Sequence, residues 1–186
     1  MRPIPIDPWS VLAGAGALAY PFVVWFGLGS LPPAAFVLLG IGCIGLRLIS
    51  RWRTARSRME IFAFLLAATG LSLLLTLSPT LAARAYPVAI GLAVAGVFAA
   101  SLVFPPTIVE RLARLTEPNL SPEGIAYTTR VTRVWVAFLL LNAAISLWTA
   151  IWGTLEQWVL WNGLLSYLAM GGLFAGEYLV RRTVRA

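Results

Sequence analysis

The stretch "SPEGIAYTTRVTRVWVAFLLLNAAISLWTAIW", residues 121–152, joins a polar helix start to a long apolar run. Ser121 is a favourable N-cap, Pro122 suits the first helical turn, and Glu123 suits the positive end of a helix. Residues 134–152 are long enough to cross about 30 Å of hydrocarbon as a helix. We therefore predict one helix over residues 122–152, with its first turns standing outside a membrane.

The composition of the whole chain also indicates an integral membrane protein. Of its 186 residues, 60% are hydrophobic and 11% are charged, whereas about a quarter of the residues are charged in typical soluble domains. The polar intervals are too short to bury a second core. We expect a single transmembrane domain over residues 1–186.

Six apolar runs are long enough to span the hydrocarbon. They cover residues 9–28, 33–49, 61–78, 86–104, 134–152 and 158–180. The first run is longer than the apolar part of a signal peptide, so we interpret it as a retained span. Because the backbone must satisfy its own hydrogen bonds in lipid, the predicted fold class is all-α: a polytopic membrane protein with six transmembrane helices.

The distribution of arginine predicts the orientation of these spans. All 14 basic residues are Arg, and 13 of them flank the spans on one side, while only Arg84 falls on the other. By the positive-inside rule, both termini and residues 105–133 are cytoplasmic. The net charge of +7 follows from topology and attraction to anionic lipid, so nucleic acid is not an expected partner. The external connections, 29–32, 79–85 and 153–157, are short.

The cytoplasmic segment 105–133 has its own helical pattern. Thr107 and Glu110 have the spacing of a capping box, and Ile108, Val109, Leu112 and Leu115 fall on one helical face. This predicts a short amphipathic helix in the membrane interface. Partner- or headgroup-binding candidates are Tyr127, Arg130, Arg133, Arg111 and Arg114. The alternative is a capped helical hairpin whose arginines only set topology.

Polar residues inside the predicted spans form a second candidate group. These intramembrane candidates are Asn142, Asn162, Tyr167 and Glu177. Asn142, Asn162 and Tyr167 either hold helices together or line a polar cavity. Glu177 is either a functional group or one half of an interfacial ion pair with Arg181, four residues later. Gly172 and Gly176 have the spacing of a close helix contact, which would form within one chain or between the chains of a homo-oligomer.

The residues of most catalytic sites are missing from this sequence. It has no His, a single Cys (Cys43), no Walker loop and no GxGxxG motif. This excludes a Ser-His-Asp triad and His-ligated metal, and no two acids share an apolar helix. We expect no enzyme activity, no cofactor and no metal.

Several segments carry a resemblance to known bacterial families. The segments "FPPTIVERLAR" (104–114), "YTTRVTRVW" (127–135), "LLLN" (139–142) and "LFAGEYLVRR" (173–182) resemble an uncharacterised bacterial inner-membrane protein family. Its members are often encoded beside fatty-acid-type enzymes that make aryl polyenes. The six-span layout is more distantly similar to the intracellular septation protein A type. The resemblance implies an inner-membrane accessory role and supplies no catalytic residues.

Two functions follow as expectations. The first is a non-enzymatic scaffold in the bacterial inner membrane, whose arginine-rich face docks acyl-chain or polyene biosynthesis enzymes or an acidic acyl carrier protein. The second is a transporter or flippase of a lipid-like molecule, with its path along the polar faces of the last two spans. Membrane lipids are expected partners in both.

Overall fold

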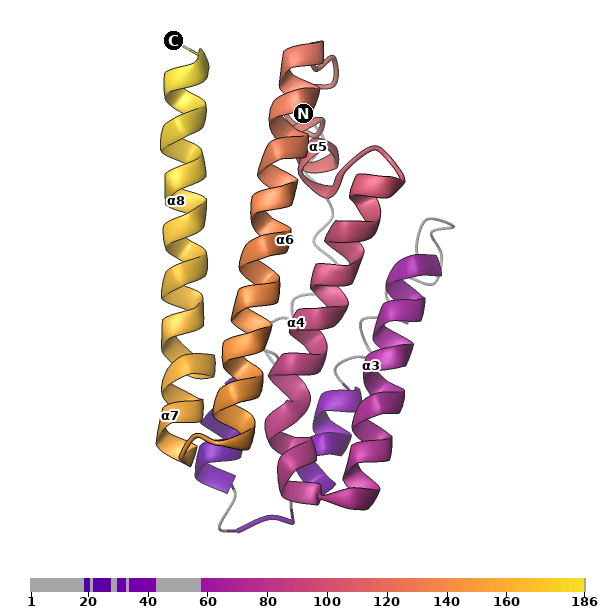
Figure 1. The fold of residues 1–186 in the computed structure, drawn as a ribbon, viewed down its shortest axis with the longest axis vertical. Helices are drawn as coiled ribbons and strands as arrows, with labels where there is room; N and C mark the ends of the chain where they lie inside the picture. Colours follow the sequence, from indigo (N-terminus) through magenta and orange to yellow (C-terminus); the bar gives the residue numbers. More distant parts are fainter. Residues whose placement is uncertain (1–18, 21, 28–29, 33, 43–57, 186) are drawn as a thin grey trace.

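The computed structural model describes residues 19–20, 22–27, 30–32, 34–42 and 58–185, and its named elements are all helices. α3, α4, α6 and α8 lie side by side along the long axis of the molecule (Figure 1). Their bounds, with those of the shorter elements, are α3 Arg58–Leu77, α4 Pro79–Val103, α5 Ile108–Ala113, α6 Pro122–Ile151, α7 Leu155–Leu160, the π-helical turn η2 Trp161–Leu165, and α8 Ser166–Arg185.

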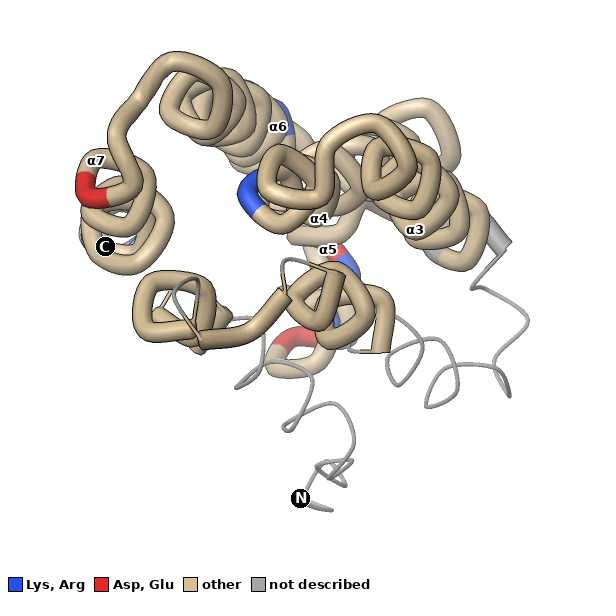
Figure 2. The backbone as a smooth tube through the Cα atoms, turned by 90° about the horizontal axis from the view of Figure 1, so that it is seen from below, with Lys and Arg blue, Asp and Glu red and all other residues tan. Residues whose placement is uncertain are grey.

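Three helices are long and apolar enough to cross a membrane. They are Pro79–Val103, Pro122–Ile151 and Leu155–Arg181, and Ile61–Leu77 is a shorter apolar helix. Charged positions are sparse along these helices in Figure 2. The expected all-α membrane protein is confirmed at this level. The predicted spans 9–28 and 33–49 lie largely outside the described residues; their described parts, 22–27 and 34–42, are helical.

Two connections predicted from the sequence are shorter in the structure. Residues 79–85 were predicted as an external loop, but α4 already begins at Pro79. The Ser78 side chain caps the helix by accepting from the Leu81 N–H, and Pro79 stands in the first turn, where no N–H is needed. Likewise, α7 begins at Leu155 inside the predicted loop 153–157, because Thr154 and Gln157 form a reciprocal capping box.

The long helix α6 begins at Pro122, as predicted, and ends at Ile151. Its 30 residues correspond to about 45 Å, so it is longer than the hydrocarbon thickness. Its buried positions recur at three- and four-residue spacing and are mostly small: Thr128, Thr132, Trp135, Leu139, Ala143, Ser146, Thr149 and Ala150. A Cβ added at Gly91 of α4 would lie 3.5 Å from the Cβ of Ala143. Small side chains therefore let α4 and α6 approach closely.

The most buried core lies at the α7 end of the molecule. Trp158 is fully buried and its indole N–H donates to the Arg84 carbonyl. The Tyr20 hydroxyl donates to the Ala83 carbonyl over 2.8 Å, and its ring lies 4.1 Å from that of Tyr86. A Cβ at Gly40 would lie 2.5 Å from the Tyr86 ring, so this position needs glycine. These contacts tie both the N-terminal helical residues and α7 to α4.

Candidate functional site

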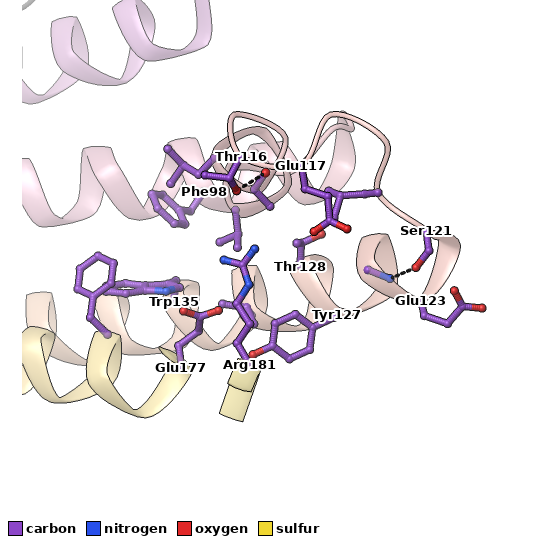
Figure 3. A pocket seen from close by; sticks show the side chains of 17 residues that line it. Phe98, Thr116, Glu117, Ser121, Glu123, Tyr127, Thr128, Trp135, Glu177 and Arg181 are labelled. Carbon is purple, nitrogen blue, oxygen red and sulfur yellow. Dashed lines mark hydrogen bonds between the residues drawn. The ribbon is translucent and has the colours of Figure 1, made fainter. Parts of the chain in front are cut away.

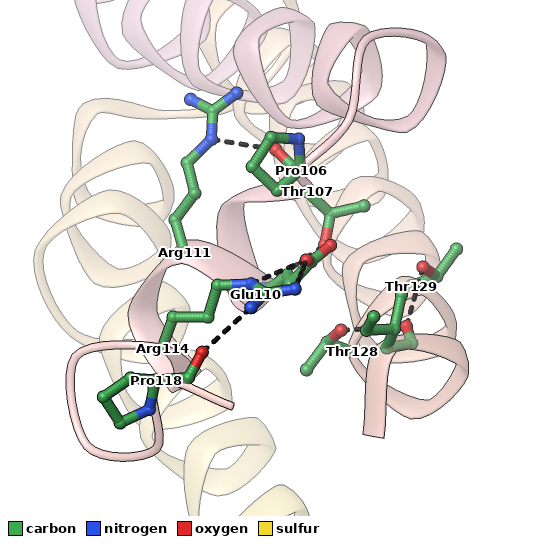
Figure 4. Close-up of polar contacts among 9 residues, drawn as sticks. Pro106, Thr107, Glu110, Arg111, Arg114, Pro118, Thr128 and Thr129 are labelled. Atoms are coloured by element: carbon green, nitrogen blue, oxygen red, sulfur yellow. Dashed lines mark hydrogen bonds and ion pairs between the residues drawn. The ribbon is translucent and has the colours of Figure 1, made fainter. Parts of the chain in front are cut away.

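The segment between α4 and α6 is held in place by capping and ion-pair contacts (Figure 4). The Thr107 side chain accepts from the Glu110 N–H at the start of α5, which is one half of the predicted capping box; the Glu110 carboxylate binds Arg114 and not the Thr107 N–H. Glu110 pairs with Arg114 at 2.8 Å, and the Arg114 guanidinium also donates to the Pro118 carbonyl. Arg111 donates to the Pro106 carbonyl. The candidates Arg111 and Arg114 therefore brace their own segment.

The predicted apolar face of this short helix is only partly correct. Leu112 and Leu115 are exposed, whereas Glu110 is 5% exposed. Glu110 can be buried because its backbone N–H donates to the Thr107 hydroxyl and its carboxylate accepts from the Arg114 guanidinium. The exposed leucines remain available for lipid or for another chain.

A pocket of about 490 Å³ lies between α5, α6 and α8; we call it the α5–α6–α8 pocket. Its large apolar lining residues are Phe98, Val109, Leu112, Leu120, Val131, Trp135 and Phe174. Its polar lining residues are Thr116, Glu117, Ser121, Glu123, Tyr127, Thr128, Glu177 and Arg181. The volume is within the range of small-molecule sites.

Aromatic rings form one end of this pocket. The Trp135 ring lies 4.5 Å from Phe174 of α8 and 6.3 Å from Phe98 of α4, measured between ring centroids. Three helices therefore meet at Trp135, which is 7% exposed. The apolar end is built from residues far apart in the sequence, and sequence patterns did not single out Phe98 or Phe174.

Charged and hydroxyl groups form the other part of the pocket. Figure 3 shows Glu177 and Arg181 of α8 beside Tyr127 of α6, with Ser121 and Glu123 further from Trp135. Glu177 and Arg181 lie close enough to the Tyr127 hydroxyl for both of their charges to act on it. Two candidates that the sequence treated separately, Tyr127 and Glu177, thus meet in one site.

Arg130 and Arg133 do not share that site. The pocket face of α6 carries Tyr127, Val131 and Trp135 at four-residue spacing. Arg130 and Arg133 fall outside this spacing, have exposed side chains and do not line the pocket. The structure therefore does not bring Tyr127, Arg130 and Arg133 together as one clamp.

Asn162 joins α6 to the π-helical turn η2. It is 4% exposed, its side chain accepts from the Ser146 hydroxyl at 2.7 Å, and its amide donates to the Trp158 carbonyl at 2.9 Å. The bond to Ser146 is the interhelical contact expected of polar residues that hold membrane helices together, whereas the bond to Trp158 lies within the helical stretch formed by α7 and η2. The Oδ1 of Asn142, one turn before Ser146 on α6, is buried and has no hydrogen-bond partner within the part of the chain that the structure describes. Tyr167 is partly buried and does not line the α5–α6–α8 pocket.

Gly172 and Gly176 lie on an exposed part of α8. A Cβ added at either position would meet no atom of the described residues within 4 Å. Among the described residues, these glycines form no close contact within the chain. The sequence prediction of packing between chains stays a prediction.

Arg84 has a structural role, whereas in the sequence it stands out only as the single arginine on the predicted external side. Its guanidinium donates to the carbonyls of Thr149, Gly153 and Thr154 at 2.6, 2.7 and 3.2 Å. These carbonyls lie at the end of α6, where unpaired acceptors and the negative end of the helix dipole favour a cation. Arg84 therefore joins α4 to the α6–α7 turn.

Within the described residues, no group of three or more His, Cys, Asp or Glu is placed to hold a metal ion, and Cys43 lies outside them. Comparisons with protein-family models, curated proteins and solved structures find no match to this chain. The family resemblance noted in the sequence therefore stays a prediction, and the α5–α6–α8 pocket carries the functional argument.

Proposed function

We propose that this protein is a non-enzymatic accessory protein of the bacterial inner membrane. It binds a lipid-like chain in the α5–α6–α8 pocket and docks acyl-chain or polyene biosynthesis enzymes, or their carrier protein, at its cytoplasmic face. The observation that carries this proposal is the pocket itself, which has aromatic residues at one end and charged residues at the other. An amphipathic molecule likewise has an apolar part and a polar part.

The level of the pocket in the membrane supports the proposal. The pocket includes the first turns of α6 and the segment that follows α5, where the sequence predicts the cytoplasmic interface. The N-cap of Ser121 and the braces from Arg111 and Arg114 hold these walls together. A chain bound there would have its apolar end among the helices and its polar end within reach of cytoplasmic proteins.

The exposed residues Arg130 and Arg133 supply the proposed docking surface beside the pocket. They point away from the bound chain, so they are available to phosphate headgroups or to an acidic carrier protein. Arg111 and Arg114 contribute less, because their guanidinium groups already bind Pro106, Glu110 and Pro118.

The transporter alternative receives less support. Its path would run along Asn142, Ser146 and Asn162, but Ser146 and Asn162 bind each other. The buried Oδ1 of Asn142, which has no hydrogen-bond partner among the described residues, favours a polar path through this region.

The test is purification of the tagged full-length protein from its native cells in mild detergent after brief cross-linking. Mass spectrometry then identifies both bound lipids and bound proteins. We expect a co-purified acyl or polyene chain, lost in Phe174→Ala, and cytoplasmic acyl-chain proteins, lost in Arg130→Glu/Arg133→Glu. The control is Glu156→Lys, an exposed charge change in α7. Recovery of neither a chain nor an acyl-chain protein from the wild type would contradict the proposal.

A further inference from the structure

The α5–α6–α8 pocket ends at a floor of aromatic rings. Among the described residues, its lining reaches Trp135 on α6, Phe174 on α8 and Phe98 on α4, and it extends no further toward α7. The Trp135 ring lies 4.5 Å from Phe174, 6.3 Å from Phe98 and, edge-on, 5.8 Å from Phe138, measured between centroids. One turn beyond Trp135, Leu139 is buried. The rings therefore close the pocket on the side of α7.

The two long walls of the pocket give the same depth above this floor. On α6, Tyr127 precedes Trp135 by eight positions, which correspond to about 12 Å along a helix. On α8, Arg181 follows Phe174 by seven positions, which correspond to about 10 Å. Figure 3 shows Tyr127 beside Arg181 and places Trp135 at the far end of the pocket. A distance of roughly 10–12 Å therefore separates the polar groups from the ring floor.

This depth limits the length of a bound chain. An extended hydrocarbon chain advances about 1.25 Å per carbon, because its bonds of about 1.5 Å follow a zigzag. Roughly eight to ten carbons therefore span the distance from the polar groups to the rings. The pocket volume of about 490 Å³ is that of a site for one small molecule. A typical phospholipid has two chains that each cross half of a layer about 30 Å thick, so its chains are too long for this depth.

We infer that the α5–α6–α8 pocket selects a single chain of about eight to ten carbons, and that Trp135 sets this length. This inference rests on the proposed function and adds the length class of the ligand. A longer chain would have to fold back or displace the rings, and forcing extra methylene groups into a packed cluster is unfavourable. Trp135 is 7% exposed and contacts rings of both α4 and α8, so its replacement opens the floor most directly.

The experiment uses the full-length protein in lipid nanodiscs and two photo-crosslinking alcohols with the same head. The short probe has about nine carbons, and the long probe has about twice as many. Each is made in two forms, with a diazirine either beside the hydroxyl or at the far end of the chain, and mass spectrometry quantifies the labelled residues. At equal mole fraction in the membrane, we expect the short head-labelled probe to label Tyr127 about fivefold more than the long one. The far-end diazirine of the short probe should label Trp135 or Phe98.

Variants of the floor give a second readout. Trp135→Leu and, independently, Phe98→Ala remove ring volume and deepen the pocket toward α7. In both variants we expect the long probe to label Tyr127 within about twofold of the short probe. The matched control is Trp148→Leu, which changes an exposed tryptophan of the same helix outside the pocket and should keep the wild-type preference.

Each outcome decides a different part of the inference. Equal labelling of the wild-type pocket by both probes overturns the length limit and leaves the proposed function standing. A length preference that persists in both floor variants overturns the role of the rings, as does far-end labelling of membrane-facing residues by the short probe. Absence of pocket labelling by every probe overturns both the inference and the proposed function.

Discussion

At the scale of single residues, Arg84 shows how one partly buried cation connects distant parts of the chain. Its guanidinium binds three carbonyls around the α6–α7 turn, and its own carbonyl accepts from the Trp158 indole. Carbonyls at a helix end in an apolar setting have few other donors. Arg84, the one arginine that the sequence places on the opposite side from the other 13, therefore has a structural role.

Replacing Arg84 with Leu should destabilise the protein by about 2–3 kcal/mol, because several partly buried carbonyls lose their donor. The measurement is thermal unfolding in mild detergent, compared with Arg130→Leu, whose side chain is exposed. If both variants unfold at the wild-type temperature, the capping role assigned to Arg84 is wrong.

A second residue pair, Ser146 and Asn162, distinguishes helix packing from a transport path. Their hydrogen bond is 2.7 Å long and buried. In a double-mutant cycle with Ser146→Ala and Asn162→Ala, we expect a coupling of about 0.5–2 kcal/mol in unfolding free energy. Additive effects on stability, with loss of transport of a lipid-like molecule, would instead favour the transporter alternative.

At the scale of elements, N-cap side chains decide where α5, α6 and α7 begin. Thr107, Ser121 and Thr154 each accept from a backbone N–H three residues later. α5 has only six residues, so it depends on its cap and on tertiary contacts. When α5 is folded as a helix, it places Val109 and Leu112 in the pocket wall.

Removing the α5 cap with Thr107→Ala should cost about 1 kcal/mol. Opening of the segment would then become about fivefold more frequent, and trypsin would cut faster after Arg111 and Arg114. The control is Thr129→Ala, which removes a hydroxyl bound within α6. Unchanged cleavage at both arginines would show that tertiary contacts alone hold α5.

At the scale of the whole molecule, antiparallel helices place the functional groups at one end and the tightest core at the other. The α5 segment, the start of α6 and the end of α8 lie at the same end in Figure 1, and α7 lies at the opposite end. Under the positive-inside rule, the end with α5 is cytoplasmic. The pocket would then open toward the cytoplasm.

This orientation predicts the labelling of single cysteines in a Cys43→Ser background. Ser121→Cys should be protected from a membrane-impermeant thiol reagent in intact cells and labelled after lysis. Thr154→Cys, at the opposite end, should be labelled before lysis. The reverse pattern would invert the proposed topology and remove the cytoplasmic docking surface.

Local sequence determined the elements whose signals lie within a few residues. The Ser121-Pro122 start of α6, the Thr107 cap and the apolar runs of α4, α6 and α8 were predictable because capping and hydropathy act over one or two turns. The starts at Pro79 and Leu155 were misplaced because hydropathy alone set the ends of the predicted spans, and the local caps Ser78-Pro79 and Thr154–Gln157 were not used.

Tertiary structure alone decided the site. Trp135, Phe98 and Phe174 come from three helices, and Glu177 meets Tyr127 only because α8 returns beside α6. Sequence spacing grouped Tyr127 with Arg130 and Arg133, since all three lie near one another along a single helix. Side chains on one helix can point to different neighbours, so a pocket between helices depends on packing angles and distances that no local pattern contains.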